Sequence, residues 1–329
     1  MQVENTINFD HHYHGAFDFS PKWRFVQGYW FGNLLKQIVD TALKKNIQLI
    51  SLVSEDFGEE EKCGGIVIGK DSIHNKFAQI ERFALRLPKE YGHDVDQSVM
   101  KIEHNGKEVY IIHTQVPIVK DKGRRLDHLV IGGNHERTIP NLLPLDETNE
   151  WINDNYDTNQ IIRVAEHIGL EEHFGLTGEK FLEEFRNGNY DALEFNAQMI
   201  NPSNLNALRY KIPFLGSKLK VANKGLNEAN RDIAMKHNIP MLYGSDGHRV
   251  EHIGLACSRF PYSSINTSSA LSLLRSLRIN IIANNFKGQE GYASCLQWTR
   301  WLSEFVVGHG IKMPHPDLTA VYRKGTFKS

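Results

Sequence analysis

The sequence predicts an α/β protein built on parallel strands, because three features recur together along its 329 residues. Short apolar runs alternate with stretches of helical period, which is typical of βαβ units. The runs are continuously apolar, as expected for strands that are covered on both faces. Most runs end in a cluster of polar residues. In closed barrels and open sheets alike, the carboxyl ends of parallel strands share one edge, where binding sites are assembled.

Seven strands are expected, and six of their carboxyl ends carry a His, Asp or Gln side chain that could bind a metal ion. The expected strands are residues 6–9, 47–53, 109–112, 129–131, 161–165, 192–195 and 240–243. Between several of them the apolar residues recur with a period of 3.6, which predicts helices. The clearest such helices are residues 32–45, 180–186 and 226–236.

Other segments do not fit this alternating pattern. Residues 57–107 are interpreted as an insertion, with a strand-like run at 65–69, a helix-like stretch at 77–87 and a hairpin turn at Asn105-Gly106. Residues 138–158 are polar and contain Pro140 and Pro144, so a loop near the mouth of the site is expected there. From residue 262 onward two further helices are expected, at 268–277 and 294–307.

The composition excludes several classes of protein. A formal net charge of −1 and a pI near 7.0 do not favour general binding to nucleic acid. The three cysteines, Cys63, Cys257 and Cys295, lack the spacing of a disulfide framework or a thiolate zinc site. There is no apolar run of the roughly 20 residues that a membrane span needs, and no secretory signal is recognised. A cytoplasmic protein that does not bind membranes is therefore expected.

Two pairs of residues carry the chemistry that the sequence predicts. His12 and His14 are two residues apart at a strand end, so alternation places both imidazoles on one face, where they can bind one cation. Asp246 and His248 repeat this spacing within Gly244-Ser245-Asp246-Gly247-His248. His135 and His167 each follow another apolar run. Imidazole and carboxylate ligands without nearby cysteine suit Zn, Mn or Fe rather than Ca.

The pattern resembles the PHP (polymerase and histidinol phosphatase) superfamily over roughly residues 5–260. Asp10-His11-His12-Tyr13-His14 is similar to the family's opening motif D-L-H-x-H, and residues 244–248 are similar to its closing motif G-S-D-x-H. Between them, the matching segments are Ser54-Glu55-Asp56, His113-Thr114-Gln115, His135-Glu136, Glu166-His167 and Asp191-Ala192-Leu193-Glu194-Phe195-Asn196.

The resemblance implies a distorted TIM-like (β/α)7 barrel with two or three divalent metal ions at the strand carboxyl ends. The PHP-like domain would span residues 1–261, and residues 262–329 would form a C-terminal helical extension packed on the barrel. The implied metal ligands are His12, His14, Asp18, Asp56, Gln115, His135, His167, Asp246 and His248. Asp56 stands in place of a family histidine and Gln115 in place of the bridging glutamate, while His113 could compensate for Gln115.

The function expected from such a site is hydrolysis of a phosphate ester by metal-activated water. His135, His248 and Asp246 are the expected catalytic residues, and Arg137, Arg163 and Arg249 the expected phosphate-binding residues. A small phosphoester is the expected substrate. The alternatives are a non-catalytic or regulatory metal-binding domain, a nuclease acting on nucleic-acid ends, and an amidohydrolase, which is disfavoured because no lysine lies at a predicted strand end.

Overall fold

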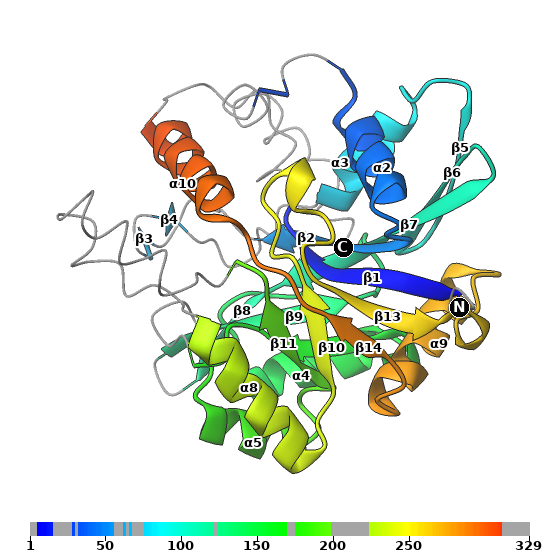
Figure 1. Ribbon diagram of the computed structural model, residues 1–329. Helices are drawn as coiled ribbons and strands as arrows, with labels where there is room; N and C mark the ends of the chain where they lie inside the picture. Colours follow the sequence, from blue (N-terminus) through cyan, green and yellow to red (C-terminus); the bar gives the residue numbers. More distant parts are fainter. Residues whose placement is uncertain are drawn as a thin grey trace.

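The computed structural model describes residues 5–15, 28–29, 32–55, 62–63, 66–67, 76–121, 124–169, 175–198 and 224–310. These residues form a mixed α/β barrel (Figure 1). Along the main sheet the strands follow the order β12-β11-β10-β9-β7-β2-β1-β13-β14. None of the helices in these residues has the length and apolarity that a bilayer crossing requires.

All seven strands expected from the sequence are present in this sheet. They are β1 (Thr6–Tyr13), β2 (Leu49–Glu55), β7 (Lys107–Val116), β9 (Arg124–Ile131), β10 (Ile162–Ala165), β11 (Ala192–Asn196) and β12 (Met241–Gly244). The sheet nearly closes, because the backbone N–H of His14, just beyond β1, donates to the carbonyl of Gly247 beyond β12 at 2.9 Å. The predicted distorted TIM-like barrel is confirmed in this form.

The direction of β9 departs from the parallel arrangement that the sequence predicts. β1, β2 and β7 are parallel neighbours, and so are β10, β11 and β12, but β9 runs antiparallel to both β7 and β10. The short strand β8 (Ile118–Asp121) pairs with the first half of β9 as a hairpin. The first half of β9 therefore lies beside the carboxyl ends of its neighbours.

The interior of the barrel is apolar toward the amino ends of its strands. Side chains from every one of the seven strands join one buried cluster with α9 (Ala270–Ile282), whose Leu273, Leu274 and Leu277 are fully buried. Because Ile7 and Ile162, at the amino ends of their strands, belong to this cluster, α9 closes the amino end of the barrel. The polar residues are left at the carboxyl end.

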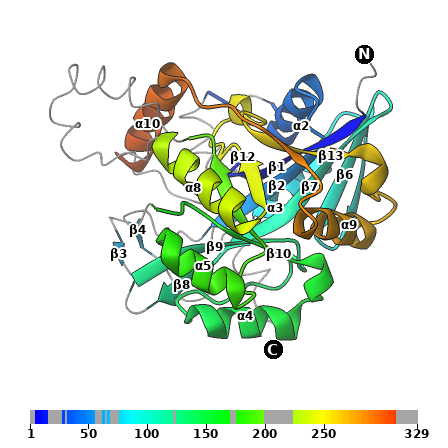
Figure 2. The same cartoon turned by 60° about the horizontal axis from the view of Figure 1, so that its bottom comes forward.

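Helices cover the outer face of the sheet (Figures 1 and 2). α2 (Leu34–Lys44) and α3 (Lys76–Ala84) pack on β1, β2 and β7. α5 (Gly178–Arg186) and α8 (Lys224–His237) pack side by side on β10, β11 and β12. α2 begins where Asn33 accepts a hydrogen bond from the Lys36 amide, and its buried stripe is Leu34, Leu35, Ile38, Val39 and Ala42.

Two interpretations of the irregular segments meet different outcomes. The hairpin at Asn105-Gly106 is confirmed between β6 (Val99–His104) and β7, and both turn residues have positive φ, as a type I′ turn requires. The loop expected over residues 138–158 is wrong, because α4 (Leu145–Asn155) lies within it. Pro144 precedes this helix, Asp146 and Glu147 occupy its first turn, and its buried face is half polar, which weakened the apolar period.

The remaining strands either extend the main sheet or, for the pair β3 and β4, form a separate two-stranded sheet. The remaining elements are β3 (Lys62–Cys63), β4 (Ile66–Val67), β5 (Tyr91–Asp96), β13 (Cys257–Pro261), β14 (Lys287–Gln289) and α10 (Cys295–Gly310), with short 3-10 turns at Thr158–Gln160, Val250–His252 and Tyr262–Ser264. Both C-terminal helices expected from the sequence are present, as α9 and α10.

Candidate metal centre

An irregularity in β1 places its histidines. Between Asp10 and Tyr13 the strand has one residue more than its partner segment Ile50–Leu52 in β2, which is a β-bulge. The bulge lets two consecutive side chains reach the same carboxylate. The Nδ1 atom of His12 lies 2.5 Å from the Oε1 atom of Glu194, and Nε2 of His11 lies 3.7 Å from it.

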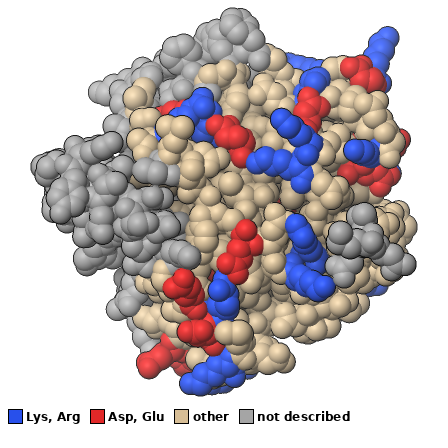
Figure 3. All heavy atoms as spheres, viewed as in Figure 1, with Lys and Arg blue, Asp and Glu red and all other residues tan. Residues whose placement is uncertain are grey.

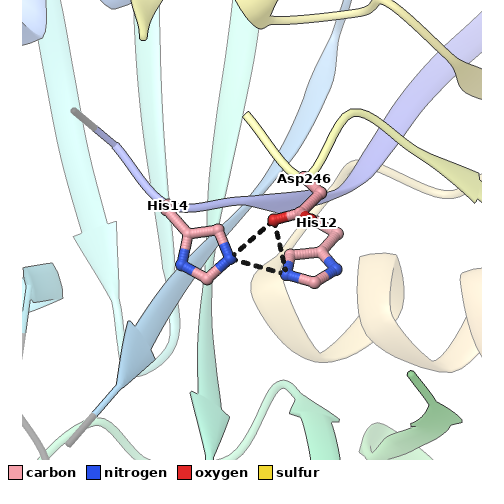
Figure 4. A group of neighbouring side chains, drawn as sticks. All are labelled: His12, His14 and Asp246. Carbon is pink, nitrogen blue, oxygen red and sulfur yellow. Dashed lines mark hydrogen bonds and ion pairs between the residues drawn. The ribbon is translucent and has the colours of Figure 1, made fainter. Parts of the chain in front are cut away.

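Three side chains converge at the carboxyl edge of the barrel (Figure 4). The Nε2 atoms of His12 and His14 are 2.8 Å apart, and the Oδ1 atom of Asp246 lies 3.6 Å from the first and 3.0 Å from the second. All three residues are buried. The backbone of Asp246 has a φ of +46°, which few non-glycine residues adopt and which turns its carboxylate toward the histidines.

His248 extends this group. Its Nε2 atom lies 3.3 Å from the Asp246 Oδ1 atom, and its ring stacks on that of His14 with 4.2 Å between centroids. On its other side the ring stacks on Trp301 of α10 at 5.0 Å. The structure therefore brings together His12, His14, Asp246 and His248.

The loop after β12 is held against β1 by Asp10. Its carboxylate accepts hydrogen bonds from the backbone N–H groups of Ser245 and Gly254, each at 2.8 Å. Burial raises the pKa of Asp10 to about 6, and these hydrogen bonds oppose the rise. Gly244 allows the close approach, since a Cβ atom there would lie 2.7 Å from the His11 ring.

The electrostatics of the site favour cations. Burial alone would lower the pKa of His12, but the carboxylates of Glu194, Glu166 and Asp246 outweigh it and hold that pKa well above its ordinary value. Burial likewise raises the pKa of Asp246, and the neighbouring histidines, His12 first, outweigh it so that the pKa falls well below its usual range. The site is thus a concentration of negative charge that attracts positive charge.

His167 lies in a second group with Glu166 and Asp127. One ligand atom from each of these three residues falls within 4.8 Å of the others. Asn196 connects the two groups, because its side-chain nitrogen lies 3.2 Å from His167 Nδ1 and donates to Asp246 Oδ2 at 2.9 Å.

The structure does not bring His135 to either group. It follows the carboxyl end of β9, and because β9 is antiparallel, that end points away from the edge that the other strand ends share. His135 instead contacts the Gln97 carbonyl, the Glu81 carboxylate at 3.4 Å and the ring of Phe77.

Gln115 is also separated from the centre, by the alternation of β7. Ile112 and Val116 point into the barrel, so His113 and Gln115 share the opposite face with Ile111, which packs under α2 and α3. The Gln115 amide is engaged there with the backbone, since it donates to the Arg137 carbonyl at 2.9 Å and accepts from the Ile139 amide at 2.9 Å.

The three arginines expected to bind phosphate have other partners. Arg137 is exposed and donates to the Asn155 side chain and carbonyl. Arg163 faces outward from β10 and contacts Asp191 and Asn149. Arg249 is buried and donates to Glu251 and to both carboxylate oxygens of Glu304 in α10, so it anchors that helix beside the site. Asp18 and Asp56 lie outside the described residues.

Glu194, Glu166 and Asp127 were not expected as site residues. Glu194 and Asn196 carry a signal that could have been used, because alternation from the apolar Ala192 points both into the barrel. Asp127 could be found only with the direction of β9 known.

The fold and these converging side chains define an α/β barrel with a candidate metal centre at its carboxyl edge. The family model described as PHP-associated matches residues 225–280, which span α8, β12, β13 and most of α9 and contain the closing motif. This match covers only part of the chain, and it agrees with the resemblance to the PHP superfamily. A search of curated proteins finds no significant match to the sequence.

Solved structures with a similar fold include the crystal structure of PsfC from Pseudomonas syringae PB-5123. It is 11% identical, the alignment covers 93% of this chain and 99% of PsfC, and the TM-score is 0.51. A two-domain protein from Bacteroides vulgatus that contains a predicted PHP-like metal-dependent phosphoesterase is 12% identical. That alignment covers 87% of this chain and 65% of the other, with a TM-score of 0.47.

Proposed function

We propose that the protein is a metal-dependent phosphoesterase whose site lies at His12, His14 and Asp246. The observation that carries the proposal is the convergence of two imidazole nitrogens and a carboxylate oxygen within 3.6 Å of one another, at the buried edge of a PHP barrel. This donor set fits Zn, Mn or Fe. A bound divalent cation polarises a phosphoryl oxygen and makes a water molecule a better nucleophile.

Residues of the chain itself orient the metal-binding histidine and supply a proton. Glu194 holds the Nδ1 side of His12, which leaves Nε2 directed toward His14 and Asp246. Of the predicted catalytic residues, His248 and Asp246 lie at the centre, and we assign His248 to proton transfer to the leaving oxygen. Trp301 stacks against His248 and limits its movement.

A small phosphate ester is the substrate class that the charge distribution favours. On the face shown in Figure 3, basic and acidic side chains are interspersed over the described surface, and the whole chain has a net charge of −1. Binding to a nucleic-acid backbone depends on clustered Lys and Arg side chains. A phosphomonoester or a small phosphodiester is therefore preferred to a nucleic-acid end.

The test is hydrolysis of a panel of aryl phosphate monoesters and diesters with added Mn²⁺ or Zn²⁺. Wild-type protein should show metal-stimulated turnover, which the double variant His12→Ala/His14→Ala should lose. His93→Ala, an exposed position on β5, is the matched control and should keep full turnover. Metal bound tightly without turnover of any ester would instead favour the non-catalytic metal-binding domain.

A further inference from the structure

One lysine is completely buried next to the candidate centre. Lys76, the first residue of α3, has no exposed surface, although lysine is almost never fully buried unless it is paired. Its Nζ atom donates a hydrogen bond to the carbonyl of His14 at 2.7 Å. Removing an ammonium from water costs free energy that an apolar side chain of the same length would not cost. A lysine at this buried position therefore indicates a role in the site.

The contact with His14 lies where the pairing of β1 with β2 ends. The last residue of β1 in that pairing is Tyr13, which lies opposite Leu52. Beyond it, the backbone N–H of His14 donates to the Gly247 carbonyl at 2.9 Å, and the His14 carbonyl accepts from Lys76. The residue that carries one of the candidate metal ligands is therefore held by the loop after β12 and by α3.

The position of the Lys76 backbone is fixed by β2. Ser54, which is fully buried near the end of that strand, accepts a hydrogen bond from the Lys76 backbone N–H through its Oγ atom at 3.1 Å. Phe77 and Ile80 of the same helix are fully buried in the cluster that α3 forms with α2 and the sheet. The lysine side chain thus reaches the centre from the side of β2, on a rigid support.

The charged groups of the centre are divided between the two sides of β1. The carboxylates that contact its histidines belong to Glu166, Glu194 and Asp246, which come from β10, β11 and the loop after β12. Lys76 comes from the other side, where β2 is the neighbour of β1. A phosphate group near the centre would be repelled by these carboxylates and attracted by the ammonium.

We propose that Lys76 supplies the positive charge that holds the phosphate group of the substrate at the candidate centre. The inference rests on the proposed function and adds the residue that recognises the substrate. The arginines expected in this role, Arg137, Arg163 and Arg249, are engaged with other partners. Inside a protein the attraction between unlike charges extends beyond direct contact, so the ammonium can keep its bond to His14 while it attracts the phosphate.

The experiment measures two affinities of the full chain, that of the Mn²⁺-loaded protein for inorganic phosphate and that of the metal-free protein for Mn²⁺. Lys76→Met should weaken phosphate binding about tenfold or more, because the nearby positive charge is lost. It should leave Mn²⁺ binding unchanged or tighter, because the same charge repels the cation. Lys76→Arg keeps the charge and should bind phosphate within about threefold of wild type.

Lys101→Met is the matched control, since it also removes one lysine charge. Lys101 lies opposite Tyr110, which in turn lies opposite Leu49 at the start of β2, so it is at the amino end of the barrel. This variant should bind both phosphate and Mn²⁺ as wild type does. Should Lys76→Met fail to fold, as judged by circular dichroism, Lys76→Gln replaces it, because the amide keeps a hydrogen-bond donor without the charge.

The sign of the metal effect separates a charge role from a purely structural one. Weaker binding of both phosphate and Mn²⁺ in Lys76→Met would mean that Lys76 only supports the end of β1, and would overturn the proposal. Unchanged phosphate affinity in this variant, or no phosphate binding by wild type, would overturn it as well. Phosphate binding that depends on Lys76 without hydrolysis of any ester would overturn the proposed function and keep this inference.

Discussion

The Nδ1 atom of His12 and the Oε1 atom of Glu194 lie 2.5 Å apart, in a hydrogen bond that is fully enclosed by the barrel. A carboxylate on one ring nitrogen of a metal-binding histidine fixes the tautomer and makes the other nitrogen a stronger ligand. Burial raises the pKa of Glu194, but the attraction of His12 outweighs it and lowers the pKa to about 2. The carboxylate is therefore charged at neutral pH.

Replacing Glu194 with Gln should weaken metal binding without unfolding the protein. The amide keeps the shape of the side chain but not the charge that increases the basicity of His12. Loss of such a partner typically lowers metal affinity about 10–100-fold. Competition with a fluorescent chelator measures the dissociation constant for Mn²⁺. Glu183→Gln, at an exposed position of α5, is the control. Equal affinity in Glu194→Gln and wild type would show that Glu194 does not have this role.

The fluorescence of Trp301, on α10, should change when a metal ion binds. Its ring stacks on His248, which stacks on His14, so this tryptophan is the one nearest the candidate centre among those described. Co²⁺ should quench the protein's fluorescence, and Trp301→Phe should remove the larger part of that quenching. Trp151 lies within α4 and packs on Tyr156, so Trp151→Phe is the control. Undiminished quenching in Trp301→Phe would show that α10 does not rest on the site.

Two buried histidines should make the fold sensitive to acid. Burial lowers the pKa of His113 and of His128 to about 3. Both stay neutral in the folded protein, while the unfolded chain takes up protons below about pH 6.5. Their contribution to stability is complete above that pH and is lost as the pH falls from 6.5 toward 3, by up to about 1.4 kcal/mol per pH unit for each group.

His113→Leu should reduce this loss, because it removes one titrating group from a buried position beside Phe77. Urea unfolding of metal-free protein at pH 7.5 and 5.0 measures the effect. Wild type should lose about 2 kcal/mol more than the variant between the two values. The exposed His93→Ala should lose as much as wild type. An equal loss in His113→Leu and wild type would mean that His113 is not buried in the neutral form.

Residues 225–280, which the PHP-associated family model matches, should be part of the barrel core. Leu277 of α9 is fully buried among side chains of the barrel interior. Leu277→Ala should therefore cost about 2–5 kcal/mol of unfolding free energy. Ile279 lies on the same helix with 62% of its surface exposed, and Ile279→Ala should change stability by less than about 0.5 kcal/mol. Similar effects of the two substitutions on chemical unfolding would contradict this packing.

The sequence was informative where a pattern is local. Apolar runs located all seven strands, and the spacing of His12 and His14 gave two neighbouring ligands, because both depend only on residues close in the chain. Which strand pairs with which, and in which direction, depends on residues far apart in the chain. The antiparallel direction of β9 therefore could not be predicted, and with it the exchange of His135 for Asp127 at the site edge.

Matching a segment to a family motif also does not determine which face of the sheet its side chains occupy. Aligning Gln115 with a bridging glutamate assigned it to the site, but alternation from Ile112 and Val116 directs it outward. Glu194 lies within a segment that resembles a family motif, and the same alternation points it inward. Whether Asp18 and Asp56 bind a metal stays a prediction, as both lie outside the described residues.

The central claim is that His12 and His14 hold the metal on which phosphoester hydrolysis depends. The most direct measurement follows turnover of an aryl phosphate ester against added Mn²⁺ while the bound metal is counted in the same samples. The proposed site predicts that turnover rises with metal occupancy in wild type and in His93→Ala. In His12→Ala/His14→Ala, turnover should fall to background. Unchanged turnover in the folded double variant, or a metal-loaded wild type that hydrolyses no ester, would contradict the claim.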